Sequence, residues 1–463
     1  MPDLPIHEPL VFVDLETTGA NFANDRIIEV GLIQVDQEGV REWSTLVDPG
    51  LPVSPFITGL TGIDTKMVEG APTFEQLAPE LLEKLRGRLF IAHNARFDYG
   101  FLKHEFRRIG IAFRATSLCT VKLSRKLFPG HHRHSLDTLV ERYGIATGDR
   151  HRALADARVL WDLWQHWHAL LPAETIRNAV ELITGRPELP SQLDPALLDD
   201  LPEAPGAYAL FGKEGELLLA KRATNIRQQV FTHFAPAKRD TALVRDTWRI
   251  EWREAAGELG ARLREFELTA ALSRPHDDLC SWQLVCHGDG DFRPALVFAR
   301  DVDFTHTENL FGLYQSRREA VHALRKLAEA HRLCHHQVGL GNNKPGEPCI
   351  AYKQKTCRGA CIGKEPLSLH STRLMTALAK HRIHPWPYPG PITLIERDEF
   401  GMREDVHVID AWGYLGTAHD EATLQGIIEN CRTNTGSRFD PDIYRIVGKY
   451  IKEGRLKVVP LTL

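Results

Sequence analysis

The stretch Leu10-Val-Phe-Val-Asp14-Leu-Glu16 is a short run of β-branched and aromatic residues, and Thr17-Thr-Gly19 follows it directly. A run of this kind, ended by a glycine, predicts a buried strand. Asp14 and Glu16 are two residues apart, so on a strand their side chains point to the same face. Adjacent carboxylates repel one another unless a cation lies between them, and the pair therefore indicates a divalent-metal site. Taken alone, it also fits a solvated strand edge.

Two later junctions between predicted elements carry further acidic side chains, one of them together with a histidine. Asp98 follows the buried strand expected at 89–92 and opens an amphipathic stretch. His151 and Asp156 open a second helix, whose apolar face at i, i+3, i+4 and i+7 consists of Leu160, Leu163, Trp164 and Trp167. Four carboxylates and one histidine at strand and helix junctions are very unlikely to coincide by chance, and they indicate one shared divalent-metal site.

These motifs resemble those of the DEDDh exonucleases, the DnaQ-like group that includes the proofreading epsilon subunit of bacterial DNA polymerase III. The resemblance covers about 1–170, and all five signature positions are present. It implies a ribonuclease H-like fold, with a mixed central sheet flanked by helices, and hydrolysis of DNA from the 3′ end. It also implies that two Mg²⁺ or Mn²⁺ ions are held by the four carboxylates and that the histidine is the general base. The catalytic set is then Asp14, Glu16, Asp98, His151 and Asp156, and Thr17 is expected to contact the substrate.

Length and composition limit the remaining possibilities. The 463 residues suggest about three domains, and 43% hydrophobic residues fit a globular chain. Lys and Arg number 57 against 61 Asp and Glu, which argues against a histone-like protein. The chain shows no apolar run long enough to cross a bilayer, and its start lacks the features of a secretory signal. The sequence predicts a cytoplasmic, nucleoid-associated protein that binds no membrane.

The sequence predicts an α/β multidomain protein. The exonuclease domain is expected over 1–170 and a linker over 171–200, near which five prolines fall between positions 187 and 205. A small α/β domain is expected over 201–280, a cysteine-containing segment over 281–384 and a small C-terminal α/β module of unknown role over 390–463.

The segment after the linker is expected to form a hairpin followed by a helix. Tyr208 and the stretch 217–227 resemble the GIY-YIG endonuclease domain of the excision-repair protein UvrC and its relative Cho. The second tyrosine and the arginine of that family are replaced by Leu219 and Gln229. Without groups that activate water and neutralise phosphate charge, the centre is expected to be degenerate and the domain to bind DNA.

The other positions of this degenerate site are also assigned from the resemblance. His233 stands where the family has Tyr or His, and Glu265 matches the metal-binding Glu, with Glu267 as a competing assignment. Arg222 and Arg227 are expected to contact phosphate. An active second nuclease that uses Tyr208 and Glu265 stays open.

A four-cysteine cluster follows in the segment that also resembles UvrC and Cho, over about 201–365. Four thiolates favour a soft metal, so a [4Fe-4S] cluster or Zn²⁺ is expected, and reduced buried cysteines are the alternative. The regular Cys-X2-Cys pairs of zinc ribbons are absent, which favours iron–sulfur. The cluster consists of Cys334, Cys349, Cys357 and Cys361.

The linker contains Gln192-Leu-Asp-Pro-Ala-Leu197, which loosely resembles the short peptides that bind the bacterial sliding clamp. The sequence therefore leaves DNA polymerase III and the clamp open as partners beside DNA, either single-stranded or as duplex 3′ ends.

The leading hypothesis is a 3′–5′ exonuclease in DNA repair or proofreading, tethered to a UvrC-like binding module. One alternative adds endonucleolytic cleavage by the central domain, and the other is a non-catalytic DNA-repair scaffold.

Overall fold

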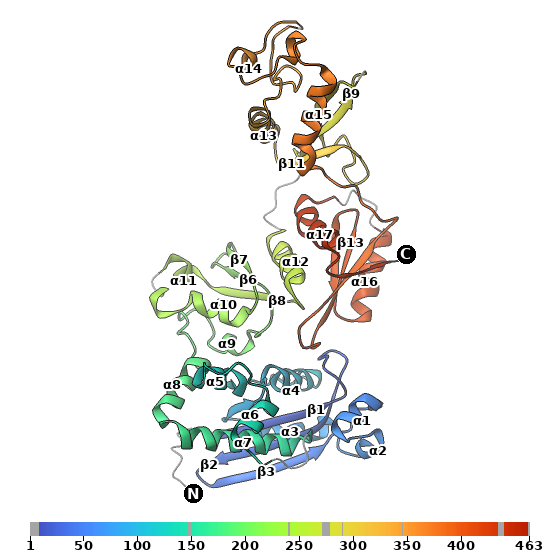
Figure 1. The fold of residues 1–463 in the computed structure, drawn as a ribbon. Coiled ribbons are helices and arrows are strands. Elements are labelled where there is room, and N and C mark those ends of the chain that lie inside the picture. The colour runs from blue at the N-terminus through green and yellow to red at the C-terminus, as the bar shows by residue number, and fades with distance from the viewer. Residues whose placement is uncertain are drawn as a thin grey trace. The chain divides into compact units, whose positions relative to one another are not determined.

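The computed structural model describes residues 9–146, 151–238, 241–270, 278–288, 290–344, 346–433 and 439–461. The chain divides into two compact units (Figure 1): Met1–Leu268 with Glu396–Asp405, and Thr269–Ile395 with Val406–Leu463. Within the described residues, no helix is both long and apolar enough to span a membrane. The predicted α/β multidomain class is confirmed.

A five-stranded sheet of order β3-β2-β1-β4-β5 forms the base of the first unit. Its strands are β1 (Leu10–Thr17), β2 (Ile27–Asp36), β3 (Gly39–Leu46), β4 (Leu89–Ala92) and β5 (Ser117–Cys119). The chain runs antiparallel between β1, β2 and β3, and parallel between β1, β4 and β5. This mixed sheet is the one that the DnaQ-like resemblance implied.

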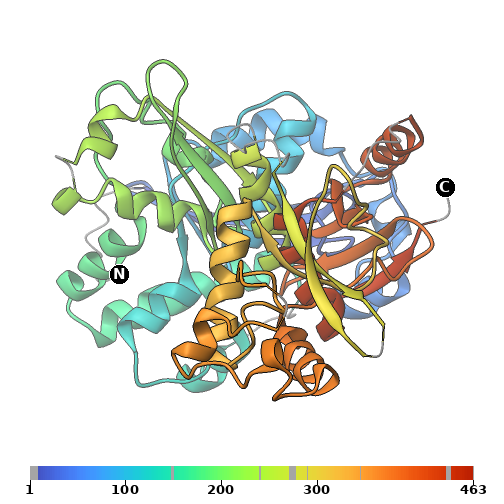
Figure 2. The same cartoon turned by 90° about the horizontal axis from the view of Figure 1, so that it is seen from above.

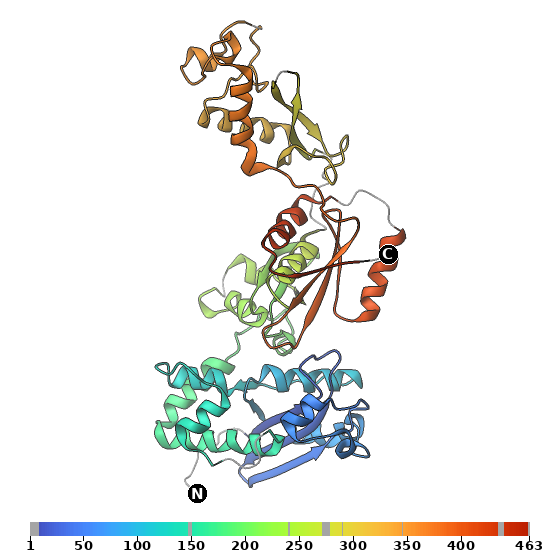
Figure 3. The same cartoon turned by 45° about the vertical axis from the view of Figure 1, so that its right-hand side comes forward.

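Helices cover both faces of this sheet, as the blue and teal elements of Figure 3 show. The side chains of β1 alternate between two buried clusters, with Val11 and Val13 in one and Leu10 and Phe12 in the other. Asp14 and Glu16 continue the second series, so they lie on the face covered by α7. The helices are α1 (Pro55–Thr61), α2 (Thr65–Val68), α3 (Phe74–Leu85), α4 (Arg96–Arg108), α5 (Thr120–Leu127), α6 (Leu136–Tyr143) and α7 (Ala153–Leu170).

The segment expected as a linker over 171–200 is largely packed. It contains α8 (Ala173–Thr184), whose Ile176 and Ala179 are buried with the α7 face, and α9 (Leu197–Asp200). Gln192 donates hydrogen bonds from Nε2 to the carbonyl oxygens of Arg245 and Thr247 at 2.9 and 3.0 Å, and Leu193 is buried. The clamp-like peptide is therefore part of a core and is not presented as an extended ligand.

The central domain is a three-stranded antiparallel sheet of order β7-β6-β8, followed by helices. The hairpin and helix expected from the sequence are present as β6, β7 and α10. The elements are β6 (Gly206–Phe211), β7 (Leu217–Ala223), α10 (Ile226–His233), the 3₁₀ turn Pro236–Lys238, α11 (Ala242–Asp246), β8 (Arg249–Glu254) and α12 (Glu258–Thr269). Glu396 accepts hydrogen bonds from the backbone N–H groups of Leu259 and Gly260, and so caps α12.

The second unit contains a sheet of order β10-β9-β11, yellow beside orange helices in Figure 2. Its elements are β9 (Cys280–Cys286), β10 (Phe292–Phe298), β11 (Leu310–Tyr314), α13 (Arg317–Ala330), α14 (Ile350–Lys353), the 3₁₀ turn Ala360–Ile362, α15 (Leu367–Leu378) and the 3₁₀ turn Ala379–His381. Ala320 and Leu324 of α13 pack with Leu374 of α15 in one core.

The last sheet has the order β14-β13-β12-β15, in keeping with the small α/β module expected over 390–463. Its elements are β12 (Ile392–Arg397), β13 (Glu404–Asp410), β14 (Gly413–Ala418), α16 (Glu421–Thr433), α17 (Pro441–Glu453) and β15 (Lys457–Pro460).

Candidate active site and cysteine cluster

Three carboxylates converge where β1 meets the start of α7. Ligand oxygens of Asp14, Glu16 and Asp156 all lie within 4.8 Å of one another. The two strand residues share a face because of the β period, and Asp156 lies in the first turn of α7. The structure thus brings together three of the five residues expected to form the site, from the first and the last of the three motifs.

The fourth carboxylate, Asp98, is buried in the first turn of α4. Burial raises the pKa of Asp98 to about 8, and a backbone hydrogen bond from Leu15 opposes the rise. This hydrogen bond places the Asp98 carboxyl against β1, because Leu15 lies between Asp14 and Glu16 in that strand.

Burial also raises the pKa of Glu16 to about 8, and the negative charges of Asp156, Glu29 and Asp98 add to the rise. Carboxyl groups crowded in this way resist ionisation unless a cation shares the site. Oxygen donors at these separations fit Mg²⁺ or Mn²⁺, which prefer carboxylate ligands. The donor set therefore fits the metal expected from the sequence.

Strand β2 holds the start of α7 in place. Glu29, whose side chain is 5% exposed, forms an ion pair with Arg152 at 2.6 Å and accepts a hydrogen bond from the Ala153 N–H at 2.9 Å. Gly31 lies opposite Asp14, and a Cβ at this position would collide with the backbone of Ala153. Glu29 lies opposite Glu16, so the two β2 residues that hold α7 face the two carboxylates of β1.

His151 directly precedes Arg152 and Ala153, the two residues that Glu29 holds. Its backbone is left-handed, with φ 63°, and its side chain is exposed. A non-glycine residue with positive φ is uncommon outside turns and functional sites. Arg152 and Ala153, which Glu29 holds, follow His151 directly and so limit where the backbone places it, two residues before α7 begins.

Thr17 does not present a free hydroxyl. Its side chain is buried, and Oγ1 donates a hydrogen bond to the carbonyl oxygen of Gly19. This contact holds the turn after β1, so the structure gives Thr17 a role in shaping the strand end.

The degenerate centre of the central domain is arranged differently. The Tyr208 hydroxyl lies 2.6 Å from Nε2 of His233, and Glu265 pairs with Arg222 at 3.3 Å. Burial raises the pKa of Tyr208 to about 12 and lowers the pKa of His233. Tyrosine and histidine are thus brought together, while the carboxylate already has a cation from the protein.

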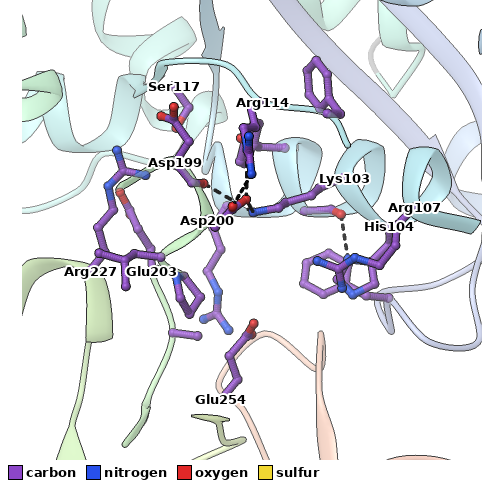
Figure 4. Close-up of a pocket in the computed structure, with 18 of the residues that line it drawn as sticks. Lys103, His104, Arg107, Arg114, Ser117, Asp199, Asp200, Glu203, Arg227 and Glu254 are labelled. Atoms are coloured by element: carbon purple, nitrogen blue, oxygen red, sulfur yellow. Dashed lines mark hydrogen bonds and ion pairs between the residues drawn. The ribbon is translucent and has the colours of Figure 1, made fainter. Parts of the chain in front are cut away.

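Arg227 is separated from this centre. It lies over the ring of Phe231 and lines a hollow of about 540 Å³ within the first unit (Figure 4). Lys103 and Arg114, which also line the hollow, both pair with Asp200, as the dashed lines show. None of the five expected exonuclease residues lines it. The expectation that Arg227 belongs to the Tyr208 site is wrong, because its guanidinium turns into this hollow.

The four cysteines expected as ligands come together. Their sulfur atoms all lie within 4.8 Å of one another, all four side chains are buried, and none forms a disulfide. Burial raises the pKa values of Cys334 and Cys361 to about 11. Four buried thiols this close together and not joined by disulfides fit a thiolate-binding metal, which would stabilise their ionised form.

His370, which the sequence analysis did not single out, supports this cluster. Its Nε2 accepts a hydrogen bond from the Cys334 N–H at 3.0 Å. Glu29 and Gly31 were missed in the same way. The available signal for Glu29 was a carboxylate inside the otherwise apolar run Ile27–Val35, because an unpaired charge is rarely buried.

Three parts of the chain match known families. Residues 11–163 match the family described as "Exonuclease", residues 281–380 the "UvrC/Cho excinuclease, middle domain", and residues 391–463 the "Excinuclease Cho C-terminal domain". "Excinuclease cho" of Shigella flexneri is 33% identical over 282 residues, which are 59% of this chain and 91% of the relative. The chain belongs to the excinuclease Cho family.

This Cho-family chain also carries an exonuclease domain. "DNA polymerase III PolC-type" of Caldanaerobacter subterraneus subsp. tengcongensis is 39% identical over 155 residues, 33% of this chain and 11% of the relative. A solved structure, "Exonuclease X in complex with 5' overhanging duplex DNA", is 27% identical, covers 37% of this chain and 99% of its own, and has a TM-score of 0.28. The expected fusion of a DnaQ-like exonuclease with UvrC/Cho domains is confirmed, and these matches support a nuclease in DNA repair. The exonuclease family implies the use of divalent metal, which the carboxylate donor set fits.

Proposed function

We propose that this Cho-family chain is a 3′–5′ exonuclease on DNA, acting in repair or proofreading, and that its central domain binds DNA without cutting it. The observation that carries the proposal is the convergence of Asp14, Glu16 and Asp156 within 4.8 Å, with buried Asp98 beside them. The Cho-family module favours repair over dedicated replicative proofreading.

The four carboxylates would hold two divalent ions, which when bound activate water and stabilise the leaving 3′ oxygen. Asp14 and Glu16 supply ligands from one strand face, and Asp156 supplies one from α7. His151 is assigned as the general base that takes the proton of the attacking water, the role that the DnaQ-like resemblance implies for it. The Glu29–Arg152 pair keeps the segment that carries His151 in register with β1.

The central domain is assigned a binding role because its centre has lost the parts that cutting needs. Leu219 and Gln229 replace the second tyrosine and the arginine. Glu265 forms an ion pair with Arg222, and this contact would compete with a metal ion for the carboxylate. The domain boundaries of this proposal are 1–170, 201–280, 281–384 and 390–463.

The decisive experiment compares labelled linear strands with a covalently closed circle, each with Mg²⁺ or EDTA. A 5′-labelled strand should give a ladder that shortens from the 3′ end, the circle should stay intact, and Asp14→Ala should abolish the ladder. Shortening from the 5′ end would refute the polarity. Nicking of the circle that survives Asp14→Ala would show that the central domain cuts.

The cysteine cluster is assigned a soft metal, with [4Fe-4S] and Zn²⁺ as its two candidate occupants. Sulfur separations within 4.8 Å suit a single tetrahedral ion, since ligands about 2.3 Å from zinc lie about 3.8 Å apart. Protein purified without oxygen should contain either four irons with visible absorbance or one zinc. Cys357→Ser should lose the metal, whereas Cys286→Ser, at an exposed cysteine outside the cluster, should retain it. Metal-free wild-type protein would refute the assignment.

A further inference from the structure

Helix α13 presents one strongly basic face. Its buried side consists of Ala320, Leu324 and Ala328, which pack in the core of the second unit. Five basic side chains on the rest of the helix are exposed: Arg317, Arg318, His322, Arg325 and Lys326. Arg318, His322 and Arg325 follow one another at i, i+4 and i+7, so they lie on one stripe about 10 Å long.

This stripe is electrostatically unfavourable for the isolated helix. Arg317 and Arg318 occupy the first turn, at the positive end of the helix dipole, where cations destabilise a helix. In the part of the chain that the structure describes, none of the five basic side chains has an ion pair. The nearby Glu319 is directed to the helix start, where it accepts a hydrogen bond from the Gln315 N–H at 2.8 Å.

The surroundings add to the positive charge. Residues 281–384 contain 15 Lys and Arg against 9 Asp and Glu, whereas the whole chain has a formal net charge of −4. The face also lines an open groove of about 880 Å³, whose walls include four of the basic side chains, Arg317, Arg318, His322 and Arg325, and one carboxylate, Glu319. Uncompensated cations gathered along a groove are suited to an anionic polymer.

We propose that the basic face of α13 binds the phosphate backbone of DNA, at a place separate from the Asp14 and Tyr208 centres. Arg318 and Arg325 are about 10.5 Å apart along the helix axis, which matches about three steps of a DNA strand. The phosphates compensate the charge that the protein leaves unpaired. Such contacts hold the strand without reading its sequence. This inference rests on DNA being the substrate, as in the proposed function.

The test measures binding to a fluorescent DNA duplex by anisotropy over a series of salt concentrations. The full chain carries Asp14→Ala so that the DNA stays intact. Adding Arg318→Ala and Arg325→Ala should weaken binding about tenfold and reduce the slope of log K against log salt by about 1.8. Lys449→Ala with Lys452→Ala is the matched control, because it removes two exposed cations from α17 and should change binding less than twofold.

Unchanged affinity and slope in the α13 variant would overturn the inference, as would an equal loss in the α17 control. Tighter binding of duplex RNA through the same arginines would overturn the assignment to DNA. A second assay separates the two proposals. It measures hydrolysis of a trinucleotide by the chain with Asp14 restored, with and without the two α13 substitutions. If the wild type hydrolyses the trinucleotide but the α13 substitutions do not weaken duplex binding, only the inference about α13 fails. If the wild type does not hydrolyse the trinucleotide, the exonuclease proposal fails.

Discussion

The exonuclease centre and the Tyr208 centre each contain a carboxylate expected to bind metal, but the groups around the two carboxylates carry opposite charges. Around Glu16 the neighbouring groups include Asp156, Glu29 and Asp98, which raise its pKa. Around Glu265 the neighbour is Arg222, which pairs with it. The first centre thus needs a cation from solution, whereas the second already has one from the protein.

This difference shows that the presence of a carboxylate does not by itself make a metal-binding nuclease centre, since the charges around it also matter. Carboxylates that crowd one another are ready to bind metal, because metal relieves their repulsion. A carboxylate paired with arginine has lost that driving force. The four experiments below test the contrast.

The largest effect is expected from Asp14→Ala. Loss of one of the converging ligands should lower metal-dependent hydrolysis of a linear strand at least about 1000-fold. Glu38→Ala, at an exposed carboxylate of the same domain, should change the rate less than twofold. Comparable activity in Asp14→Ala would place the hydrolytic centre elsewhere.

Glu29→Gln should reduce kcat about 10- to 100-fold with little change in KM, because residues that orient a metal site typically contribute this much. The amide cannot form the ion pair with Arg152 that fixes the start of α7. Glu42→Gln is a close control, because Glu42 also pairs with an arginine of α7, Arg158, but at an exposed position. Steady-state kinetics should show less than a twofold change for Glu42→Gln. Equal rate changes in both variants would refute the inference that Glu29 positions the start of α7.

The pH dependence of metal binding follows from the raised pKa values of Glu16 and Asp98, about 8 in each case. The ions bind the deprotonated groups, so the Mg²⁺ concentration for half-maximal activity should rise about tenfold per pH unit for each proton displaced as pH falls below about 8. In metal-free protein the folded state binds the extra protons. Its stability should therefore decrease as pH rises from about 4.5 to 8, and Mg²⁺ should restore it. Thermal unfolding with and without Mg²⁺ measures both trends, and a pH-independent Mg²⁺ requirement would contradict the raised pKa values.

The smallest effect is expected from Tyr208→Phe. The exonuclease rate should stay within twofold of wild type, because the hydroxyl bonds to His233 in the central domain. Removing that buried hydrogen bond should lower the free energy of unfolding by about 1 kcal/mol, measured by urea denaturation. A closed circle that is nicked by wild type and spared by Tyr208→Phe would instead show an active second nuclease.

Much of the exonuclease site could be predicted because its signals are local. A β-branched run with carboxylates two residues apart predicts both the strand and the shared face of Asp14 and Glu16. A helix face at i, i+3, i+4 and i+7 predicts α7. The four cysteines could be grouped because they fall within one short segment of the chain.

The contacts that could not be predicted join residues far apart in the chain. Glu29 and Arg152 are 123 positions apart, and their pairing depends on how α7 packs against β2. The turning of Arg227 toward its hollow and the burial of Leu193 likewise depend on the packing around them. Local sequence patterns cannot predict such contacts, because the contacts depend on how distant elements pack.

By itself, therefore, the sequence determined the chemistry of this protein: a strand-borne pair of carboxylates, their three distant companions, and a set of four thiols. Those signals are short-range, because backbone periodicity sets where neighbouring side chains point. Only the tertiary structure decided which charges are compensated. It leaves Glu16 among carboxylates, pairs Glu265 with an arginine and, among the residues that the structure describes, gives the five basic side chains of α13 no ion pair. The reason is that a charge is stabilised or destabilised by the groups that packing brings within a few ångströms of it.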